Sequence, residues 1–264
     1  MKGRVLIVAG SDSGGGAGIQ ADIKTVSAFG AYAATAITAI TVQNTLGVEN
    51  VHFVPPDIIA DQIRVVLDDI GADAVKTGML GTAAAVTATA EALARHGAGV
   101  PLVVDPVMIS KSGARLLDED AVAQLKRALL PRAALVTPNF PEAEALTGVA
   151  VSGREGAERA GRHLLELGAG AALVTGGHGQ SARVDDVLVT RQGMRVFSSS
   201  RLDTRHTHGT GCTLASAVAA GLAQGADLEA AVERAIAYVQ KAIRTAPGFG
   251  AGHGPLNHLH RFGD

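Results

Sequence analysis

The stretch "RVLIVAGSDSGGGAGIQAD", residues 4–22, runs from an unbroken apolar segment through a glycine-rich turn into a helical pattern. Unbroken apolar strands are typical of parallel sheets, because helices cover both faces of such a sheet. The sequence therefore predicts an α/β fold with a mostly parallel central sheet. Since no Pro/Ser-rich or charged linker divides the chain, we expect one domain over residues 1–264. Four later segments repeat the apolar part of this pattern: "DAVKTGM" (73–79), "PLVVDPVM" (101–108), "AALVTPN" (133–139) and "AALVTGGH" (171–178).

The segments between and after these strands also carry clear patterns. Helical spacing of apolar residues predicts helices within residues 55–71, 118–131 and 154–168. The segments "ARVDDVLVT" (182–190) and "MRVFSSS" (194–200) alternate instead, which predicts an antiparallel hairpin. Two further helices are expected, from Thr213 to Gly225 and from Leu228 to about Thr245.

The composition excludes several classes of protein. A formal net charge of −2 and an aromatic content of 3% argue against binding of nucleic acid or of an anionic membrane surface. No apolar run reaches the roughly 18 residues that a membrane span needs. The chain has one cysteine, so it cannot form an internal disulfide. We therefore expect a cytoplasmic protein whose partners are small molecules.

Ligands of an open parallel sheet bind beyond the carboxyl ends of its strands. The first loop there holds glycines at 14, 15, 16 and 18, which do not match the G-x-G-x-x-G dinucleotide pattern. The chain contains no Gly-Lys pair, so a P-loop is excluded. Four glycines in one turn indicate a loop whose backbone approaches a ligand. The full set of such loops is residues 11–18, 76–79, 105–113, 137–142 and 175–178.

The segment "HGTGC", residues 208–212, predicts an anion site at the start of a helix. Backbone N–H groups from Gly209 to Cys212 can point at phosphate oxygens, and the helix dipole favours negative charge there. The same positive end should lower the pKa of the Cys212 thiol and leave it partly ionised, able to take a proton from a hydroxyl group. The alternative is a cysteine that fills a gap in the core.

Acidic side chains stand at two neighbouring strand ends. Asp105 ends the run "LVVD", and Asn139 and Glu142 stand three residues apart where a strand passes into a helix. Oxygen ligands of this kind suit Mg²⁺, which completes its shell with water and nucleotide phosphates. The alternative is a helix capping box, which explains Asn139 and Glu142 but not Asp105. Zinc and hydrolase sites are disfavoured, because the histidines lie in Gly/Pro-rich loops and no G-x-S-x-G motif occurs.

Taken together, these segments resemble the hydroxymethylpyrimidine/phosphomethylpyrimidine kinases, the thiamin-biosynthesis members of the ribokinase superfamily. The resemblance runs from about Val5 to His258. Its blocks are "AGSDSGGGAGIQADIKT", "AITAITVQNTLGV", "DAVKTGML", "VVDPVMISKSG", "TPNFPEAEAL", "GGH", "HGTGCTL" and "GHGPLNH".

The resemblance implies a three-layer α/β/α fold, commonly a homodimer, and a kinase that uses ATP and Mg²⁺. Such enzymes phosphorylate 4-amino-5-hydroxymethyl-2-methylpyrimidine to its monophosphate and then to its diphosphate. The resemblance also implies residue roles. Gln43 would pair with the aminopyrimidine edge, in a pocket lined by Gly10, Asp22, Met79 and Val107. Asp105 and Glu142 would serve the magnesium and phosphates, with Asn139, Thr175 and His178 on the nucleotide side. Gly209, Thr210, Gly211 and Cys212 would form the anion hole, with Cys212 as general base.

One departure from the family pattern concerns positive charge. Relatives usually read Lys-Gly-Gly-His where this chain reads Thr175-Gly-Gly-His, so a lysine expected near the transferred phosphates is missing. Lys76, Lys111 or an arginine such as Arg205 could substitute for it. The alternatives to the expected activity are a pyridoxal kinase and a nucleotide- or pyrimidine-binding protein without turnover.

Overall fold

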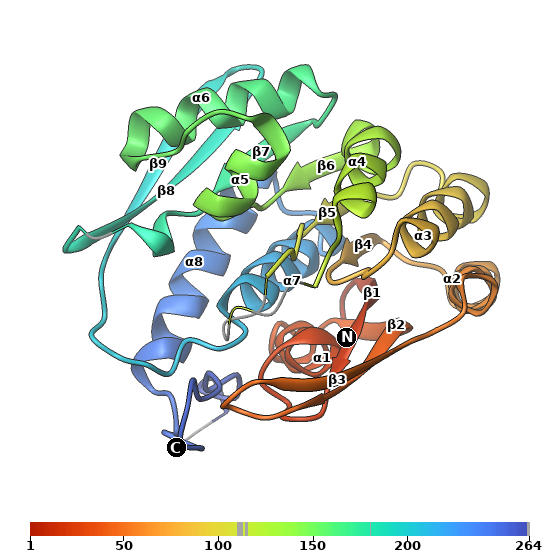
Figure 1. Cartoon of the computed structure of the whole chain (residues 1–264), viewed down its shortest axis with the longest axis horizontal. Helices are drawn as coiled ribbons and strands as arrows, with labels where there is room; N and C mark the ends of the chain where they lie inside the picture. The colour runs from red at the N-terminus through yellow and green to blue at the C-terminus, as the bar shows by residue number, and fades with distance from the viewer. Residues whose placement is uncertain (110–112, 114–115, 180, 263–264) are drawn as a thin grey trace.

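The computed structural model describes residues 1–109, 113, 116–179 and 181–262. Its centre is a nine-stranded sheet in the order β3-β2-β1-β4-β5-β6-β7-β8-β9, parallel from β2 to β7 and antiparallel at both edges (Figure 1). The predicted mostly parallel sheet is confirmed. The strands are β1 (Arg4–Asp12), β2 (Tyr32–Gln43), β3 (Val48–Phe53), β4 (Ala74–Thr77), β5 (Leu102–Val104), β6 (Ala133–Val136), β7 (Ala171–Val174), β8 (Arg183–Thr190) and β9 (Gly193–Ser200).

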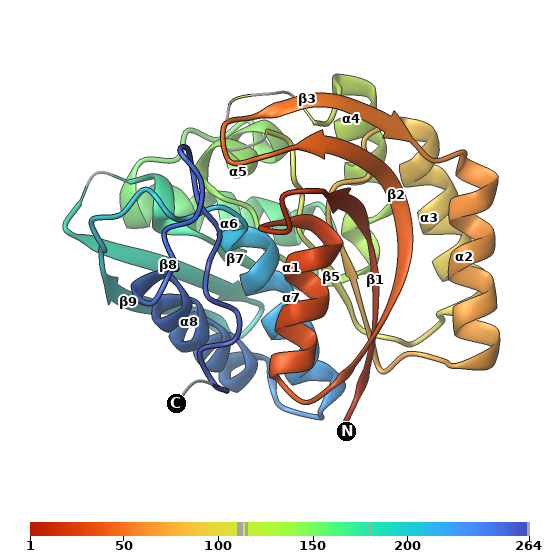
Figure 2. The same ribbon diagram turned by 90° about the horizontal axis from the view of Figure 1, so that it is seen from below.

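Helices cover both faces of the sheet, as Figure 2 shows. Alternate residues of β1 feed two separate cores: Leu6 and Val8 pack with α2 to α6, whereas Val5 and Ile7 pack with α1, α7 and α8. This burial on both faces is why the strands read as unbroken apolar runs. The helices are α1 (Gly18–Ala28), α2 (Pro56–Asp69), α3 (Ala83–His96), α4 (Glu119–Ala128), α5 (Phe140–Thr147), α6 (Gly153–Glu166), α7 (Thr210–Ala223) and α8 (Leu228–Arg244), with 3-10 turns η1 (Leu130–Arg132) and η2 (Gly176–His178).

The sequence-based elements mostly agree with the structure. Helices α2, α4 and α8 lie in the predicted segments, α6 begins one residue before its segment, and β8 and β9 form the predicted antiparallel hairpin, with Thr190 opposite Gly193. Strands β2 and β3 were not predicted from the sequence. Strand β2, "YAATAITAITVQ", is rich in alanine, which favours helices, and its burial comes from pairing with β1.

Helix α7 begins at Thr210, three residues before the predicted start. Its N-cap, Gly209, has a φ of +82°, and a Cβ built there would lie 1.9 Å from the carbonyl oxygen of Gly16. Only glycine allows both this conformation and this close approach. The glycine loop after β1 and the start of α7 are therefore in direct backbone contact, although 193 residues separate Gly16 from Gly209.

A buried ion pair joins three elements below the carboxyl edge of the sheet. Lys76 in β4 has 0% exposure, and its Nζ lies 3.0 Å from both carboxylate oxygens of Asp22 in α1. Ser216 in α7 donates a hydrogen bond to Asp22 at 2.7 Å. Burial alone would lower the pKa of Lys76, but the charges of Asp22 and Asp105 outweigh it and raise the pKa. The lysine is therefore charged and ties α1 to β4, with α7 attached through Ser216.

No helix within the described residues is both long and apolar enough to cross a bilayer.

Replacing Lys76 by Met should destabilise the protein strongly, because it leaves the Asp22 carboxylate buried without its counter-charge. We expect the free energy of unfolding to fall by about 3–5 kcal/mol. Urea denaturation monitored by circular dichroism measures it. The control is Lys241→Met on the exposed face of α8, which should change stability by less than about 0.5 kcal/mol. Similar small losses in both variants would refute a stabilising ion pair.

Candidate active site

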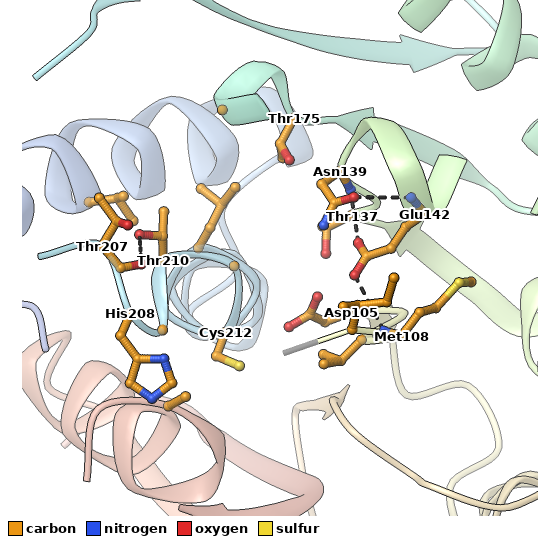
Figure 3. A pocket seen from close by; sticks show the side chains of 18 of the residues that line it. Asp105, Met108, Thr137, Asn139, Glu142, Thr175, Thr207, His208, Thr210 and Cys212 are labelled. Atoms are coloured by element: carbon orange, nitrogen blue, oxygen red, sulfur yellow. Dashed lines mark hydrogen bonds between the residues drawn. The ribbon is translucent and has the colours of Figure 1, made fainter. Parts of the chain in front are cut away.

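The loops at the carboxyl edge of the sheet enclose a cavity of about 1110 Å³ (Figure 3). Most of the residues singled out from the sequence line it: Gly10, Gln43, Met79, Asp105, Val107, Asn139, Glu142, Thr175, Gly209, Thr210, Gly211 and Cys212. Asp22 is not among the lining residues, so the prediction that it lines this pocket is wrong. Its carboxylate is fully buried behind the wall, where Lys76 and Ser216 bind it. His178 ends η2, and its side chain lies outside the described part of the structure.

The first turn of α7 offers backbone donors to the cavity. Thr210 N–H donates to the Thr207 carbonyl at 3.3 Å, and the Thr210 hydroxyl donates to the same carbonyl at 2.7 Å. Within the described residues, the N–H groups of Gly211 and Cys212 have no acceptor. They stand at the positive end of a 14-residue helix, where an anion is stabilised. The turn therefore has the geometry of an anion site.

The Cys212 sulfur lies at the cavity wall beside Asp105, facing it in Figure 3. The sulfur is close enough to Asp105 to lower the pKa of that carboxyl group, and the backbone N–H of Gly18 lowers the pKa of the thiol. Although Cys212 is only partly buried, the removal of water around the sulfur raises its pKa to about 12. The charge of Lys76 lowers it, and the charges of Asp105 and Asp22 raise it. The predicted lowering of this pKa is wrong, because burial of the sulfur is the largest effect and raises the pKa.

Asp105 and Glu142, the two acids expected to face a metal ion, both lie where a negative charge is unfavourable. Burial raises the pKa of Glu142 to about 8, and the neighbouring Asp105 adds to the shift. Burial also raises the pKa of Asp105, which Lys76 at 3.6 Å only partly offsets. The buried Oδ2 atom of Asp105 accepts no hydrogen bond in the described structure, and it is the atom that lies 3.6 Å from Nζ of Lys76. A cation between the two carboxylates would offset their burial and their mutual repulsion.

Asn139 and Glu142 form the capping box of α5 that the alternative interpretation predicted. The Asn139 side chain accepts from the Glu142 N–H at 3.0 Å, and Glu142 accepts from the Asn139 N–H at 2.9 Å. Both residues also line the cavity, and Glu142 accepts from the Met108 N–H at 3.4 Å. The capping box therefore fixes Glu142 in place without removing it from the site.

The described residues contain no cluster of three or more His, Cys, Asp or Glu side chains that could hold a metal ion. Asp105 and Glu142 would therefore have to share a Mg²⁺ ion with water and phosphate oxygens, which is the usual arrangement for this ion. The raised pKa values of the two acids and the repulsion between them fit such a shared site.

Asp12, which was not singled out from the sequence, organises the glycine loop. Its carboxylate accepts N–H groups of Gly14, Gly16 and Ala17 at 2.8–3.1 Å, and lies 2.8 Å from Nε2 of His208. Burial raises its pKa, but the hydrogen bonds and charge from His208 and the backbone bonds outweigh it and lower the pKa. An aspartate two residues before a glycine is a turn signal that could have identified it.

The acceptor side of the cavity carries the Gln43 amide. Its Oε1 accepts from the Thr41 hydroxyl at 3.2 Å, and its Nε2 lies 3.4 Å from Nε2 of His208. The amide can still offer both a donor and an acceptor to a planar heterocycle.

Two of the three candidates for the missing positive charge do not reach the cavity. Lys76 is buried and paired with Asp22, and Arg205 is exposed and donates to the Ala251 carbonyl at 3.2 Å. Lys111 lies outside the described residues.

Comparison with known proteins gives a consistent result. The family described as phosphomethylpyrimidine kinase matches residues 12–257. The chain is 43% identical over 257 residues to the hydroxymethylpyrimidine/phosphomethylpyrimidine kinase of Bacillus subtilis, covering 97% of this chain and 94% of that protein. It is 50% identical over 258 residues to the thiamine biosynthesis bifunctional protein ThiED of Geobacter sulfurreducens, covering 98% of this chain but only 52% of that longer protein.

Solved structures agree in fold. A phosphomethylpyrimidine kinase from Clostridium difficile superposes with a TM-score of 0.82 at 42% identity, covering 92% of this chain and all of that one (100%). An ADP complex of Bacillus subtilis pyridoxal kinase superposes with a TM-score of 0.92 at 33% identity, covering 100% of both chains. Both similarities confirm the three-layer fold expected from the sequence.

The high pKa of Cys212 is directly measurable, because it is the only cysteine in the chain. Iodoacetamide reacts with thiolates, so its rate with the folded protein should rise through pH 10 without a plateau. The same protein unfolded in urea should show a midpoint near the ordinary value of about 8.5. A midpoint below 8 in the folded protein would show that the helix start ionises the thiol after all.

Proposed function

This chain belongs to the phosphomethylpyrimidine kinase family, and from that premise we infer that it makes the pyrimidine diphosphate of thiamin biosynthesis. It transfers the terminal phosphoryl group of ATP to 4-amino-5-hydroxymethyl-2-methylpyrimidine, and then phosphorylates the monophosphate. The observation that carries the proposal is the cavity itself: the free N–H groups of α7, the Asp105–Cys212 pair and the Gln43 amide share it.

The anion site at α7 would bind the phosphoryl group in transit. The N–H groups of Gly211 and Cys212 are fixed in place before a ligand arrives, so they stabilise developing negative charge with little reorganisation. Glu142 and Asp105 are the residues that would hold Mg²⁺, which neutralises phosphate charge when bound. Because their raised pKa values reflect burial and repulsion, we expect the cation and the nucleotide phosphates to enter together.

Cys212 is proposed to accept the proton of the substrate hydroxyl. Since its thiol is protonated at rest, it must release a proton as it takes one. Because the sulfur faces Asp105 (Figure 3), the proton of the thiol would pass to Asp105 while the hydroxyl proton passes to sulfur. The sulfur is therefore neutral before and after transfer, which removes the need for a stable thiolate.

Three expectations stay proposals beside this activity. Gln43, Gly10, Met79 and Val107 would hold the pyrimidine, and Asn139, Thr175 and His178 would face the nucleotide. The protein would be a cytoplasmic homodimer. Phosphorylation of pyridoxal is the second candidate activity, because the structure superposes on a pyridoxal kinase with a TM-score of 0.92.

Product analysis by mass spectrometry, with hydroxymethylpyrimidine as the only acceptor beside ATP and Mg²⁺, tests the proposal. We expect ADP to form together with the monophosphate and then the diphosphate. A parallel reaction with pyridoxal as acceptor should be much slower. Faster turnover of pyridoxal would indicate a pyridoxal kinase. If no ADP forms with either acceptor, the protein is a binding protein without kinase activity.

The same assay on Cys212→Ala separates the two steps. The monophosphate acceptor is already anionic and needs no base, whereas the hydroxyl must lose a proton. We expect the first phosphorylation to slow by about 100-fold or more and the second by less than about tenfold. Equal losses in both steps would assign Cys212 a structural role in the anion turn.

A further inference from the structure

We propose that Arg201 is the cation of the nucleotide side of this cavity, and that its guanidinium pairs with the phosphates of the bound nucleotide. The inference rests on the proposed kinase function. Arg201 directly follows β9 and lines the cavity together with Thr175 and Gly177. It is the only lysine or arginine among the described residues of that lining.

The guanidinium is held in a fixed position by backbone carbonyls. Nε donates to the Ser181 carbonyl at 2.7 Å, and Nη1 donates to the Gly177 carbonyl at 2.9 Å. The backbone N–H of Arg201 donates to the Ala182 carbonyl at 3.0 Å. Because these bonds hold the chain after β7 against the end of β9, the side chain is oriented before a ligand binds.

The third nitrogen of the guanidinium makes no hydrogen bond to the described protein. Nη2 is buried and has no hydrogen-bond partner within the described structure. A buried donor without an acceptor is costly, and more so when it carries charge. A planar guanidinium matches phosphate oxygens well, since its donors point in parallel directions. Because Nη2 is buried, an anionic ligand in the cavity would reach it only after the guanidinium turns toward the cavity, and pairing with the anion would then satisfy this donor.

The acids nearby do not supply that anion. Asp186 and Asp203 line the same cavity, but no ion pair joins either to Arg201 in the described residues. The Asp186 carboxylate accepts the Gly176 N–H at 2.9 Å, and burial raises its pKa to about 6. Both protein acceptors of the guanidinium are thus neutral carbonyls, and its charge is uncompensated.

The surroundings leave room for a phosphate chain. A Cβ placed on Gly177 would meet no atom within 4 Å, and one on Gly179 would lie 3.9 Å from Nη2. The loop after β7 therefore exposes backbone beside the guanidinium, on the Thr175 side of the cavity. The acceptor side, with Gln43 and Asp12, has no lysine or arginine in the described lining.

A purely structural clamp is the competing explanation, because Arg201 also holds the loop after β7. Calorimetric titration with ADP and with adenosine separates the two. In Arg201→Met, we expect the dissociation constant for Mg·ADP to rise at least tenfold, while that for adenosine changes less than twofold. Arg201→Lys should recover part of the ADP affinity. A clamp would weaken both ligands equally.

Arg205→Met is the matched control, since it removes the same charge from an exposed site off the cavity wall and should leave ADP affinity unchanged. Thermal melting checks that each variant is folded, and Arg201→Lys decides the matter if Arg201→Met unfolds. Equal weakening of ADP and adenosine, unchanged ADP binding, or a wild-type protein that binds no ADP would overturn the proposal. These titrations contain no acceptor substrate, so they do not depend on the kinase reaction. A protein that binds ADP through Arg201 but does not phosphorylate hydroxymethylpyrimidine would refute the proposed function and leave this proposal standing.

Discussion

The buried ammonium of Lys76 is the interaction on which the site depends. It cannot leave its carboxylates without a large desolvation cost, so it fixes Asp22 of α1 and, through Ser216, helix α7. The same charge lies 3.6 Å from Asp105 at the end of β5. The first turn of α7 and the acid opposite its cysteine are therefore positioned by one cation beneath the cavity floor.

This arrangement leaves the cavity short of positive charge at its centre. The Lys76 charge is shared between Asp22 and Asp105, so the raised pKa values of Asp105 and Glu142 remain unrelieved. Two backbone donors at α7 and one fixed guanidinium at Arg201 flank this acidic centre. Such a distribution suits a ligand that carries its own divalent cation between phosphates, and it disfavours a bare anion.

The sequence predicted the parallel sheet and most of the cavity wall, because strand burial and loop placement follow from local patterns. Sequence-based prediction failed where residues distant along the chain determine the environment of a side chain. The thiol of Cys212 follows its buried, acidic surroundings rather than the helix start next to it, and Asp22 faces Lys76 rather than the cavity. Strand β2 was missed because its alanine-rich pattern becomes a strand only through pairing with β1, and β3, which has no alanine, is an edge strand that pairs with β2. Asn139 and Glu142 show that a capping box and a site residue can coincide.

The central claim is that backbone amides at the start of α7 bind the phosphoryl group beside the cysteine. Amide NMR spectra of the protein with Mg·ADP, aluminium fluoride and hydroxymethylpyrimidine test it most directly, because aluminium fluoride imitates the phosphoryl group in transfer. The account predicts large downfield shifts of the Gly211 and Cys212 amide protons, which adenosine alone does not cause. Unmoved signals from these two amides in a complex that forms would contradict it.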